Sequence, residues 1–519
     1  MPLLSRSIFF YFSSFIIITS GINSVSAETD PLPVYKKNCA ECHGQDRLGG
    51  IGPALLPENL KRVRKKQALN SIRNGLPATQ MPAFADKLND KELKALVNYI
   101  YTPLDTMPQW GLNEIKKSHV VYFKDEQLSN KPVFDADPLN LFLVVETGDH
   151  HATVLDGDKF EPIHRFKTRH ALHGGPKYSP DGRFVFFVSR DGWISKFDMY
   201  NLKTVAEVRA GINTRNIATS SDGRYVIAAN YLPHTLVIFS TADLSLIKII
   251  EVKDDSGNSS RVSAVYDAGP RESFIAALKD IPEVWEIPYS DNPPFYGWVH
   301  DYRMEDPPKQ KPFPLRRIQL DDYLDDFFFD QKYEYLIGAA RNSKNGQVVD
   351  LVLGAKESDI DLPGLPHLGS GITWEYQGEP VLATPNLRES EVSIINMKTW
   401  KTIKKLKTLG PGFFMRSHEK SPYAWVDVFF GPNKDVVHII DKSTLEIVKT
   451  LKPAPGKTAA HVEFTKDGKY ALLSIWEKDG AIVVYDAATL EEVKRIPMNK
   501  PSGKYNVYNK ITRSSGTSH

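Results

Sequence analysis

A short polar turn followed by an apolar run recurs through most of this 519-residue sequence. The clearest copies are Asp181-Gly182, Asp222-Gly223 and Asp467-Gly468, and each is followed after one residue by an alternating apolar run. Asp-Gly supplies the positive φ that a tight hairpin requires. Because the units return at roughly the 40-to-50-residue period of propeller blades, with no helix between them, the pattern indicates a β-propeller.

Counting the middle strand of each unit gives eight units. These strands are entered at Leu141, Phe184, Tyr225, Phe274, Tyr335, Val381, Tyr423 and Tyr470. The period alone would also allow seven blades, since residues 287–322 are irregular. We therefore predict an all-β, eight-bladed propeller over residues 119–519. We expect the alternating tail 505–508 to pair into the first blade near Val120–Phe123, which would leave no strand edge open.

The motif Cys39-Ala40-Glu41-Cys42-His43 precedes the repeats and contains both cysteines of the chain. Two thiols at this spacing can add to the two vinyl groups of one porphyrin, and the adjacent histidine then faces the iron. A redox dithiol and half of a zinc site are the alternatives. A zinc site would need a second ligand pair nearby, and no Cys/His pair lies between His43 and His119. We therefore predict one covalent haem c, attached to Cys39 and Cys42, with His43 as an axial ligand.

Residues 28–105 are expected to form a small all-α domain around this motif. Asn89-Asp90-Lys91-Glu92 caps a final amphipathic helix, whose apolar residues recur at helical spacing over 93–100. We predict Met81, in the loop before that helix, as the second axial ligand, because a thioether favours ferrous iron. Met107 is the alternative, but it falls in the predicted linker 106–118. The order of these elements resembles class I cytochrome c domains.

Residues 1–27 have the anatomy of a secretory signal peptide. Arg6 precedes the apolar run Ile8–Ile22, and Val25-Ser26-Ala27 offers a small-residue cleavage site. The run is short for a transmembrane anchor, although an uncleaved anchor is the alternative. We therefore expect a periplasmic protein cleaved near Ala27. Its 65 basic and 63 acidic residues imply no bulk attraction to nucleic acid or membrane.

Three histidines lie at comparable offsets before middle strands of the propeller, and all three could face one central space. They are His173, His367 and His461. A single such histidine is more often a loop hydrogen-bond donor, but three favour a site for a second metal or macrocycle. Arginines accompany them, and a guanidinium fork is suited to gripping carboxylates, with a solvated surface position as the alternative for each. The arginines are Arg169, Arg190, Arg215 and Arg388.

The domain order and the tail Pro501–Asn509 resemble the cytochrome cd1 family, whose propeller carries haem d1. Two activities compete within that family: reduction of nitrite, and oxidation of dihydro-haem d1 to haem d1. The reductase pattern needs two distal histidines. His367 matches one, but Asp325 stands where the other belongs, and a carboxylate would repel nitrite.

Two further features separate the branches of this family. His461 stands where the reductase pattern has a glutamine, and the runs 169–176 and 211–216 resemble the branch that oxidises dihydro-haem d1. The resemblance therefore implies an oxidoreductase that turns one propionate of dihydro-haem d1 into an acrylate and passes two electrons to haem c. This would be the last step of haem d1 biosynthesis.

The resemblance also implies residue roles and partners. His173 and His461 would be the axial ligands of the tetrapyrrole iron. His367 and Tyr505 would handle protons, and the arginines would hold carboxylates. The expected partners are the tetrapyrrole, a soluble periplasmic electron acceptor and nitrite reductase as a recipient of haem d1. The alternatives are nitrite reductase itself, a non-catalytic haem d1 carrier, and a propeller dehydrogenase for another organic substrate.

Overall fold

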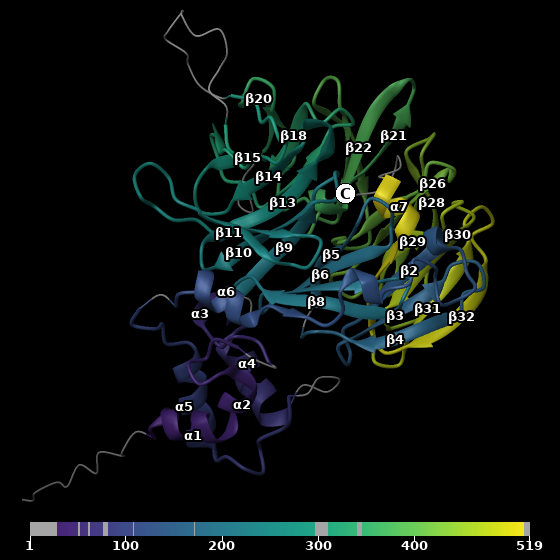
Figure 1. Ribbon diagram of the computed structural model, residues 1–519. Coiled ribbons are helices and arrows are strands. Elements are labelled where there is room, and N and C mark those ends of the chain that lie inside the picture. The colour runs from purple at the N-terminus through teal and green to yellow at the C-terminus, as the bar shows by residue number, and fades with distance from the viewer. Residues whose placement is uncertain are drawn as a thin grey trace, which may run out of the picture.

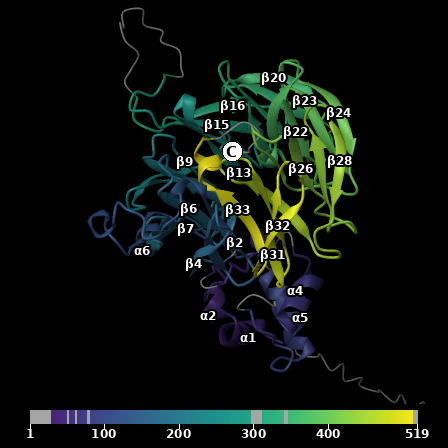
Figure 2. The same ribbon diagram turned by 90° about the vertical axis from the view of Figure 1, so that its right-hand side faces the viewer.

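The computed structural model describes residues 29–49, 52–60, 63–75, 81–106, 108–170, 172–295, 310–339 and 345–512. A group of helices at the N-terminal end of this range lies beside a ring of β-sheets (Figures 1 and 2). The predicted signal peptide and its cleavage site at Ala27 lie outside the described residues. Among the described helices, none has the length and apolar character needed to cross a membrane.

The helical part surrounds the cysteine motif. Its helices are α1 (Pro31–Asn38), α2 (Ala40–His43), α3 (Pro57–Leu60), α4 (Lys65–Asn74) and α5 (Asp90–Ile100). The Asn89 side chain accepts hydrogen bonds at the start of α5, and Glu92 returns a bond to the Asn89 N–H, as the capping box predicts. The apolar face of α5 packs with Tyr35 and Phe84 in one buried cluster.

The predicted linker contains a helix that packs against the propeller. This helix, α6 (Leu112–Ser118), contacts the outer strands β8 (Lys203–Arg209) and β12 (Leu246–Glu251). Ile115 is fully buried in an apolar cluster with Val208 and Phe239. The segment between the helical domain and the blades is therefore held on the propeller surface.

The described strands form eight sheets of four or five strands each, as expected for eight blades. In pairing order, the first two sheets are β33 (Pro501–Asn506), β2 (Leu141–Glu146), β3 (His151–Asp156), β4 (Pro162–Lys167); and β5 (Leu172–Tyr178), β6 (Phe184–Ser189), β7 (Trp193–Asp198), β8, β1 (Val120–Val121). The third and fourth are β9 (Asn213–Thr219), β10 (Tyr225–Leu232), β11 (Thr235–Ser240), β12; and β13 (Val262–Ala268), β14 (Ser273–Leu278), β15 (Glu283–Pro288), β16 (Arg316–Gln319).

The remaining four sheets continue the ring with the same antiparallel order. The fifth and sixth are β17 (Asp326–Phe329), β18 (Tyr335–Ala339), β19 (Gly346–Asp350), β20 (Ala355–Ile360); and β21 (Ile372–Tyr376), β22 (Glu379–Pro385), β23 (Glu391–Asn396), β24 (Lys401–Lys407). The last two are β25 (Met415–Ser417), β26 (Tyr423–Asp427), β27 (Val437–Asp441), β28 (Glu446–Leu451); and β29 (Ala459–Phe464), β30 (Tyr470–Ile475), β31 (Gly480–Asp486), β32 (Glu492–Met498).

The turn chemistry places the middle strands as the sequence predicts. Gly182, Gly223 and Gly468 have φ values of 75°, 76° and 72°, which residues with a Cβ rarely adopt. Six of the eight middle strands begin at the predicted residue, and Phe274 and Val381 lie inside β14 and β22. The eight-bladed, all-β prediction for this region is confirmed.

The C-terminal strand closes the ring, but not where the sequence suggested. β33 pairs antiparallel with β2, with Tyr505 opposite Leu143. The expected partner segment instead forms β1, the outermost strand of another sheet, where Val120 pairs with Glu207 of β8. The residues after β33 form the short helix α7 (Val507–Thr512). β33 thus becomes the inner strand of the first blade, and its pairing covers the edge of β2 that would otherwise face solvent.

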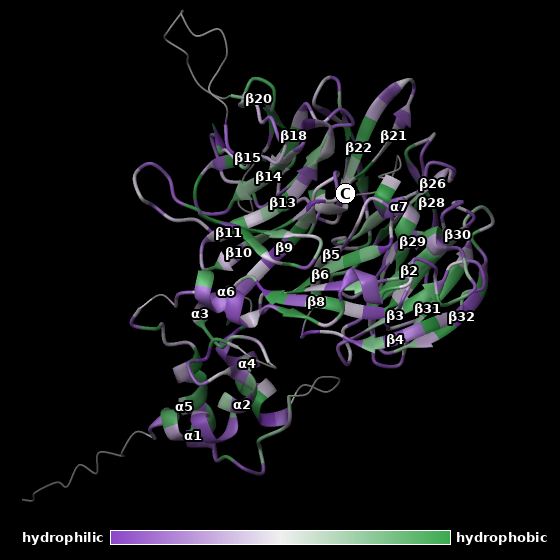
Figure 3. Cartoon of the chain, viewed as in Figure 1, coloured by the Kyte–Doolittle hydropathy of each residue, from purple (hydrophilic) through white to green (hydrophobic). Residues whose placement is uncertain are grey.

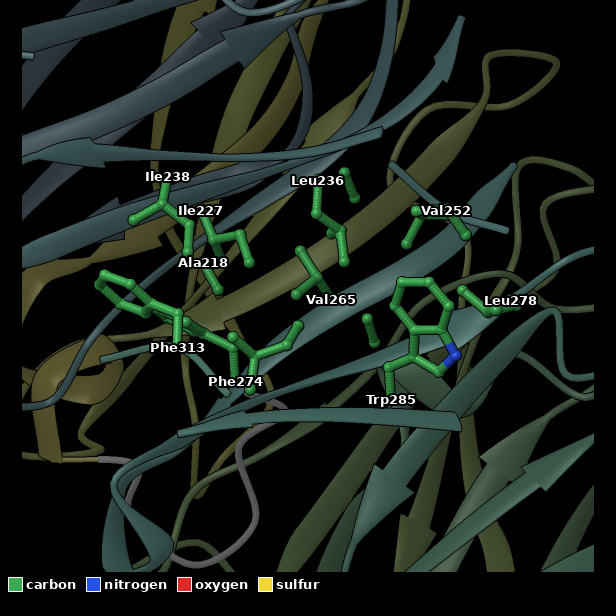
Figure 4. Packing of buried hydrophobic residues seen from close by; sticks show 14 of the residues in the cluster. Ala218, Ile227, Leu236, Ile238, Val252, Val265, Phe274, Leu278, Trp285 and Phe313 are labelled. Carbon is green, nitrogen blue, oxygen red and sulfur yellow. The ribbon is translucent and has the colours of Figure 1, made fainter. Parts of the chain in front are cut away.

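Apolar side chains fill the spaces between neighbouring sheets. Middle strands such as β2, β6 and β14 carry apolar residues on both sides, because each sheet is covered on both faces (Figure 3). One such cluster lies between the sheets of β9–β12 and β13–β16, where Trp285 is 1% exposed and packs with Phe274 and Leu236 (Figure 4). This continuous packing provides a rigid frame for the inner strands.

Candidate functional site

The cysteine motif lies at the junction of α1 and α2. Cys39 ends α1 and precedes the first turn of α2, and both thiols are free and partly exposed. Burial raises the pKa of the Cys39 thiol to about 11, so this group is a protonated thiol at neutral pH. The two sulfurs are not joined to each other, as attachment of a porphyrin at both requires.

His43 has the orientation of a metal ligand. Its Nδ1 lies 2.8 Å from the carbonyl oxygen of Pro53, and burial lowers the pKa of the imidazole. With Nδ1–H donated to that carbonyl, Nε2 keeps its lone pair for a metal. A Cβ on Gly52 would come within 2.7 Å of the His43 ring, so glycine is needed for this approach.

Met81 packs on the same apolar cluster as Cys39. Met107, the alternative ligand, lies outside the described residues. Two thiols, one imidazole with an anchored Nδ1, and one thioether over a shared apolar cluster are the donor set that haem c takes. The residues of this domain therefore fit the group that the motif predicts.

A cavity of about 710 Å³ lies at the centre of the blades. Its walls come from inner strands, including β5, β9, β13, β17, β25, β29 and β33, and from the loops before them. Aromatic side chains form one side of it, namely Phe413, Phe414, Phe429 and Trp476. A flat, partly apolar macrocycle with charged edges suits a cavity of this size and lining.

His367 and His461 both line this cavity, as the sequence predicts. His367 precedes the short helix η4 (Leu368–Ser370) and stacks on Phe413, with ring centroids 4.3 Å apart. Its Nδ1 lies 2.6 Å from the carbonyl oxygen of Phe413. Burial lowers the pKa of His367, although the nearby Asp326 opposes the shift.

His461 lies on the opposite part of the aromatic wall. Its ring centroid is 4.8 Å from that of Phe414 and 5.1 Å from that of Tyr505. Burial lowers the pKa of His461 well below its usual range, and the cations Lys504 and Arg416 add to the shift. Within the described residues, its Nδ1 has no hydrogen-bond partner.

Tyr505 also lines the cavity and comes from the ring-closing strand β33. Burial raises the pKa of its phenol to about 12, so Tyr505 is a proton donor at neutral pH. Two glycines leave room for the ring: a Cβ on Gly503 would lie 2.7 Å from the phenol oxygen, and one on Gly175 would lie 3.2 Å from Cε1.

His173 belongs to β5, whose residues Leu172 and Gly175 line the cavity. The backbone of His173 pairs with Val188 on β6, and a register shift follows it before Lys177. Its side chain lies outside the described part of the chain. Its predicted role as an axial ligand therefore stays a prediction.

The charged groups at the cavity differ from the predicted arginines. Of the four, the described lining includes Arg215, which lies near Asp326 and Tyr266. Arg169 donates to Glu207 through both Nε and Nη2 and stacks 3.8 Å from the Trp193 ring centroid. Arg388 is exposed, and Arg190 lies near Tyr231 outside this lining. The described lining does not include Arg169, Arg190 or Arg388, and their role in holding carboxylates stays a prediction.

Sequence reasoning missed most of the cations and one acidic group. The cavity is also lined by Lys177, Arg416, Lys434, Lys500 and Lys510. Arg416 is 6% exposed, and its Nε lies 3.6 Å from the buried Glu463. Lys177 and Arg416 lie on the inner strands β5 and β25, but the sequence alone carries no signal for these five cations, because lysines and arginines are common throughout the chain.

Asp325 is tied to a lysine. Its carboxylate accepts a hydrogen bond from Lys279, at the end of β14. The adjacent Asp326 faces the cavity and accepts bonds from the phenol of Tyr266 and the N–H of Gly369. The position that the nitrite-reducing pattern gives to a second histidine is thus occupied by an acid held in an ion pair.

Residues 136–510 match the family described as Cytochrome D1 heme domain, and residues 27–100 match the family described as Cytochrome C oxidase, cbb3-type, subunit III. The chain belongs to the cytochrome cd1 family. It is 54% identical, over 96% of its length and 98% of the relative's, to dihydro-heme d1 dehydrogenase of Pseudomonas aeruginosa. It is 26% identical to nitrite reductase of Stutzerimonas stutzeri, over 92% of each chain.

A solved structure agrees with this placement in the cytochrome cd1 family. The chain aligns with dihydro-heme d1 dehydrogenase NirN in complex with DHE, with a TM-score of 0.87 and 54% identity. The alignment covers 93% of this chain and all of that chain. The all-α domain followed by a propeller, predicted from the sequence, is therefore the arrangement of this family.

In this cytochrome cd1 chain, Arg209 joins the helical domain to the blades. From the end of β8, its Nη2 donates to the carbonyl of Leu48 at 2.6 Å and its Nε to that of Asp191 at 2.7 Å. The guanidinium carbon also lies 4.4 Å from the centroid of the Trp110 ring. Leu48 is five residues beyond His43, so the haem-binding loop itself is attached to the propeller.

An apolar contact lies beside this polar one. Ala54 and Leu56 of the helical domain form a buried cluster with Ile212 and Leu232 of the propeller. Ile212 is three residues before Arg215, which lines the central cavity. Ile212 directly precedes β9, so the start of this strand lies next to the haem c domain and Arg215 within it lines the cavity.

Proposed function

We propose that this chain is a dihydro-haem d1 dehydrogenase. The observation that carries the proposal is a histidine- and tyrosine-lined central cavity, joined to a haem c domain, in a chain 54% identical to that enzyme over 96% of its length. The substrate is a tetrapyrrole with carboxylate side chains, and the product differs from it by one carbon–carbon double bond.

The reaction converts a –CH₂–CH₂–COO⁻ side chain into –CH=CH–COO⁻. Two C–H bonds break, and two protons and two electrons leave the substrate. A proton acceptor must therefore lie beside the propionate, and the carboxylates must be held in place. The protein supplies position and proton transfer, while the macrocycle and haem c supply the redox chemistry.

The contacts favour exchanging two of the roles implied by the resemblance. A metal-ligating histidine commonly donates its other ring N–H to a carbonyl, which fixes the ring. His367 makes that contact with Phe413, whereas the ring of His461 lies against Tyr505. We therefore assign His367 as an iron ligand of the substrate and His461 with Tyr505 as the proton-handling pair. His173 keeps its predicted role as the opposite ligand.

Arg215, Arg416 and the cavity lysines are the groups that would hold the substrate carboxylates. Arginine offers two parallel N–H donors to one carboxylate, and the lysines add point charges. Glu463 orients the guanidinium of Arg416 on the cavity wall near Tyr505. Arg416 and Glu463 are both buried, so this ion pair is shielded from solvent. The two arginines of this proposed clamp lie on the inner strands β9 and β25.

Haem c, when bound by Cys39, Cys42, His43 and Met81, accepts one electron at a time. The contacts of Arg209 and Ile212 keep its loop next to the strand that lines the cavity. We further propose that a soluble periplasmic acceptor takes the electrons from this domain. We also propose that nitrite reductase is the recipient of the product.

The test is anaerobic mixing of the purified haem c form with dihydro-haem d1. We expect the absorption spectrum of haem d1 to grow while haem c becomes reduced. A protein that binds the tetrapyrrole without converting it, or that turns nitrite into nitric oxide at the rate of a nitrite reductase, would contradict the proposal. The Tyr485→Phe variant, altered at a buried tyrosine outside the cavity, serves as a control.

A further inference from the structure

Two buried charged residues, Asp427 and Lys504, lie directly behind the cavity wall and have no part in the chemistry described above. Asp427, at the end of β26, is 1% exposed, and Lys504, on β33, is fully buried. Ionised groups are rarely buried unless their hydrogen bonds serve a purpose, because removing them from water is unfavourable. Their partners are backbone groups of the residues that face the substrate.

Asp427 holds two separate segments of the wall. Its Oδ1 accepts from the N–H of Phe413 at 2.8 Å and of Phe414 at 3.1 Å. Its Oδ2 accepts from the N–H of His461 at 3.2 Å. The first segment carries the carbonyl that orients His367, so one carboxyl group fixes the backbone behind both histidines.

Lys504 holds the second segment from the other side. Its Nζ donates to the carbonyl of His461 and, at 2.9 Å, to Oγ of Ser474. The backbone N–H of His461 thus donates to the Asp427 carboxyl group, and its backbone C=O accepts from the Lys504 side chain. Lys504 also immediately precedes Tyr505, so its bond to the His461 carbonyl links the backbones of both members of the proposed proton-handling pair.

His461 needs this support because its backbone is strained. Its φ is 57°, and the ladder between β29 and β30 shifts register between Ala460 and Val462. In the described part of the chain, it is the one residue other than glycine that has a positive φ inside a strand. Such a conformation persists only where surrounding contacts determine it, and it is found where a side chain must be aimed.

We propose that Asp427 and Lys504 are positioning residues that set the spacing between the two walls of the cavity. Asp427 holds both the Phe413–Phe414 segment behind His367 (the His367 wall) and the backbone of His461 (the His461 wall). Lys504 holds only the His461 wall. This inference rests on the proposed function for its kinetic consequence. Its structural consequence, the backbone conformation of His461, is independent of that function.

The proposal predicts different structural effects for two variants of similar side-chain size, Asp427→Asn and Lys504→Met. Asp427→Asn replaces one acceptor oxygen by a donor, so one of the two walls is released. Lys504→Met removes the donor to His461 and leaves the His367 wall intact. We expect both to slow conversion of dihydro-haem d1 by about tenfold or more, since small misplacements of reacting groups carry large rate costs.

The spectrum of the bound substrate separates positioning from general destabilisation. Asp427→Leu, which removes both acceptor oxygens, should alter the absorption bands of bound dihydro-haem d1, because the Phe413 segment that orients His367 loses its support. Lys504→Met should leave those bands unchanged. Equal spectral effects in Asp427→Leu and Lys504→Met, or none in Asp427→Leu with a normal rate, would overturn the proposal.

Matched variants elsewhere in the propeller control for the loss of a buried charge. Asp267→Asn changes a buried carboxylate that accepts from Tyr289 at 2.7 Å, and Lys196→Met changes a buried ammonium that donates to the Ala242 carbonyl at 2.6 Å. Both should lower stability without slowing conversion. A comparable slowing in these controls would attribute the effect to loss of stability and contradict the proposal.

Two further measurements keep the proposal falsifiable if Lys504→Met does not fold or if the parent protein does not convert the substrate. Ser474→Ala removes only the second bond of Lys504 and should slow conversion less than Lys504→Met. A crystal structure of Asp427→Asn should show His461 or the Phe413–Phe414 segment displaced. If both segments keep their positions and His461 keeps its positive φ, the proposal is wrong whatever the enzyme's activity.

Discussion

Tyr505 has an unusual environment for a residue near the end of a chain: it is contributed by the ring-closing strand, its phenol is buried, and its ring touches His461. Burial raises the pKa of the phenol to about 12, so the group starts the reaction protonated. It can donate a proton or relay one to and from His461. We infer that Tyr505 acts in the reaction through the position of its O–H group beside His461.

Replacing Tyr505 by phenylalanine tests that assignment. The variant keeps the ring and its packing but loses the O–H, so uptake of the tetrapyrrole should be unchanged. We expect conversion to slow by roughly a hundredfold or more, as for loss of a general acid or base. Stopped-flow absorbance of the product and equilibrium titration of the substrate measure the two effects separately. Normal conversion would exclude a proton-handling role for Tyr505.

Buried histidines make the stability of the propeller depend on pH. His418 is fully buried beside Gly468, and burial lowers the pKa of its imidazole below 6.5, the unfolded value. Above that value the residue is neutral in both states. As the pH falls below it, the unfolded chain binds a proton that the folded chain does not, so the free energy of unfolding decreases.

The expected result is a lower urea midpoint at about pH 5.5 than at about pH 7.5. His418→Gln removes one of the groups responsible and should reduce that difference. Because His418 lies outside the cavity lining, conversion of the substrate at neutral pH should be unaffected. If the urea midpoints of His418→Gln differ between the two pH values as much as those of the parent, His418 does not contribute to the pH dependence of stability.

At the scale of elements, β33 and β5 depend on glycine where they face the cavity. A Cβ on Gly503 would meet the Tyr505 oxygen at 2.7 Å, closer than carbon and oxygen approach without displacement. Gly503→Ala should therefore push the phenol out of place while β33 keeps its pairing with β2. We expect conversion to slow by about tenfold or more, with haem c absorption unchanged.

The matched control for this substitution is Gly111→Ala. A Cβ there would lie 3.7 Å from the Glu114 carboxylate, which is an ordinary van der Waals contact. This variant should convert the substrate at the parent rate. A parent-like rate for Gly503→Ala would mean that the Tyr505 ring can shift without losing its function.

The strands were predictable from the sequence because their signals are local. Asp-Gly turns and alternating apolar runs placed β6, β10 and β30 at their first residues. The partner of β33 was not predictable in this way, since β1 and β2 both offer short apolar runs and pairing across the whole chain depends on the closed ring. The choice is made by packing, not by local propensity.

The site residues divide along the same line. His367 and His461 were expected at the cavity because histidines at matching offsets in a repeat can face one axis, whereas Tyr505 was proposed from the resemblance to the cytochrome cd1 family. The partner of Arg169 was not predictable, because a charged side chain on a loop pairs with an acid that the fold brings near it, and here that acid is Glu207. Asp427 gave no signal at all, because an aspartate at the end of a strand is ordinary until its three backbone donors are known.

At the scale of the whole molecule, Arg209 connects the two parts of the protein. Arg209→Ala removes the bonds to Leu48 and Asp191 and the stacking on Trp110. We expect slower reduction of haem c after substrate binding, because electron transfer depends on the distance between the two sites. Affinity for the tetrapyrrole should be unchanged, and Arg495→Ala, at an exposed pair with Glu492, is the control.

One haem c per chain sets a limit on conversion when no external oxidant is present. Each substrate releases two electrons, and each haem c accepts one. When the tetrapyrrole iron is already ferrous, a stoichiometric anaerobic mixture should therefore stop when about half of the tetrapyrrole is converted, and an added one-electron oxidant should let it finish. Absorbance of haem c and of the product, followed together, gives the ratio. Complete conversion without an oxidant would require another electron acceptor in the protein.

The seam between β33 and β2 has a consequence for how the protein is made. Among the described strands, the one that closes the ring follows all the others in the sequence, and it carries Tyr505 and Lys504. During synthesis, the strands of the other seven blades and the haem-binding domain are therefore made before the cavity can be completed. A chain without Pro501–Asn506, whether incomplete or proteolysed, would thus have an open ring and an incomplete cavity. Pairing of β33 with β2 therefore both closes the fold and completes the site.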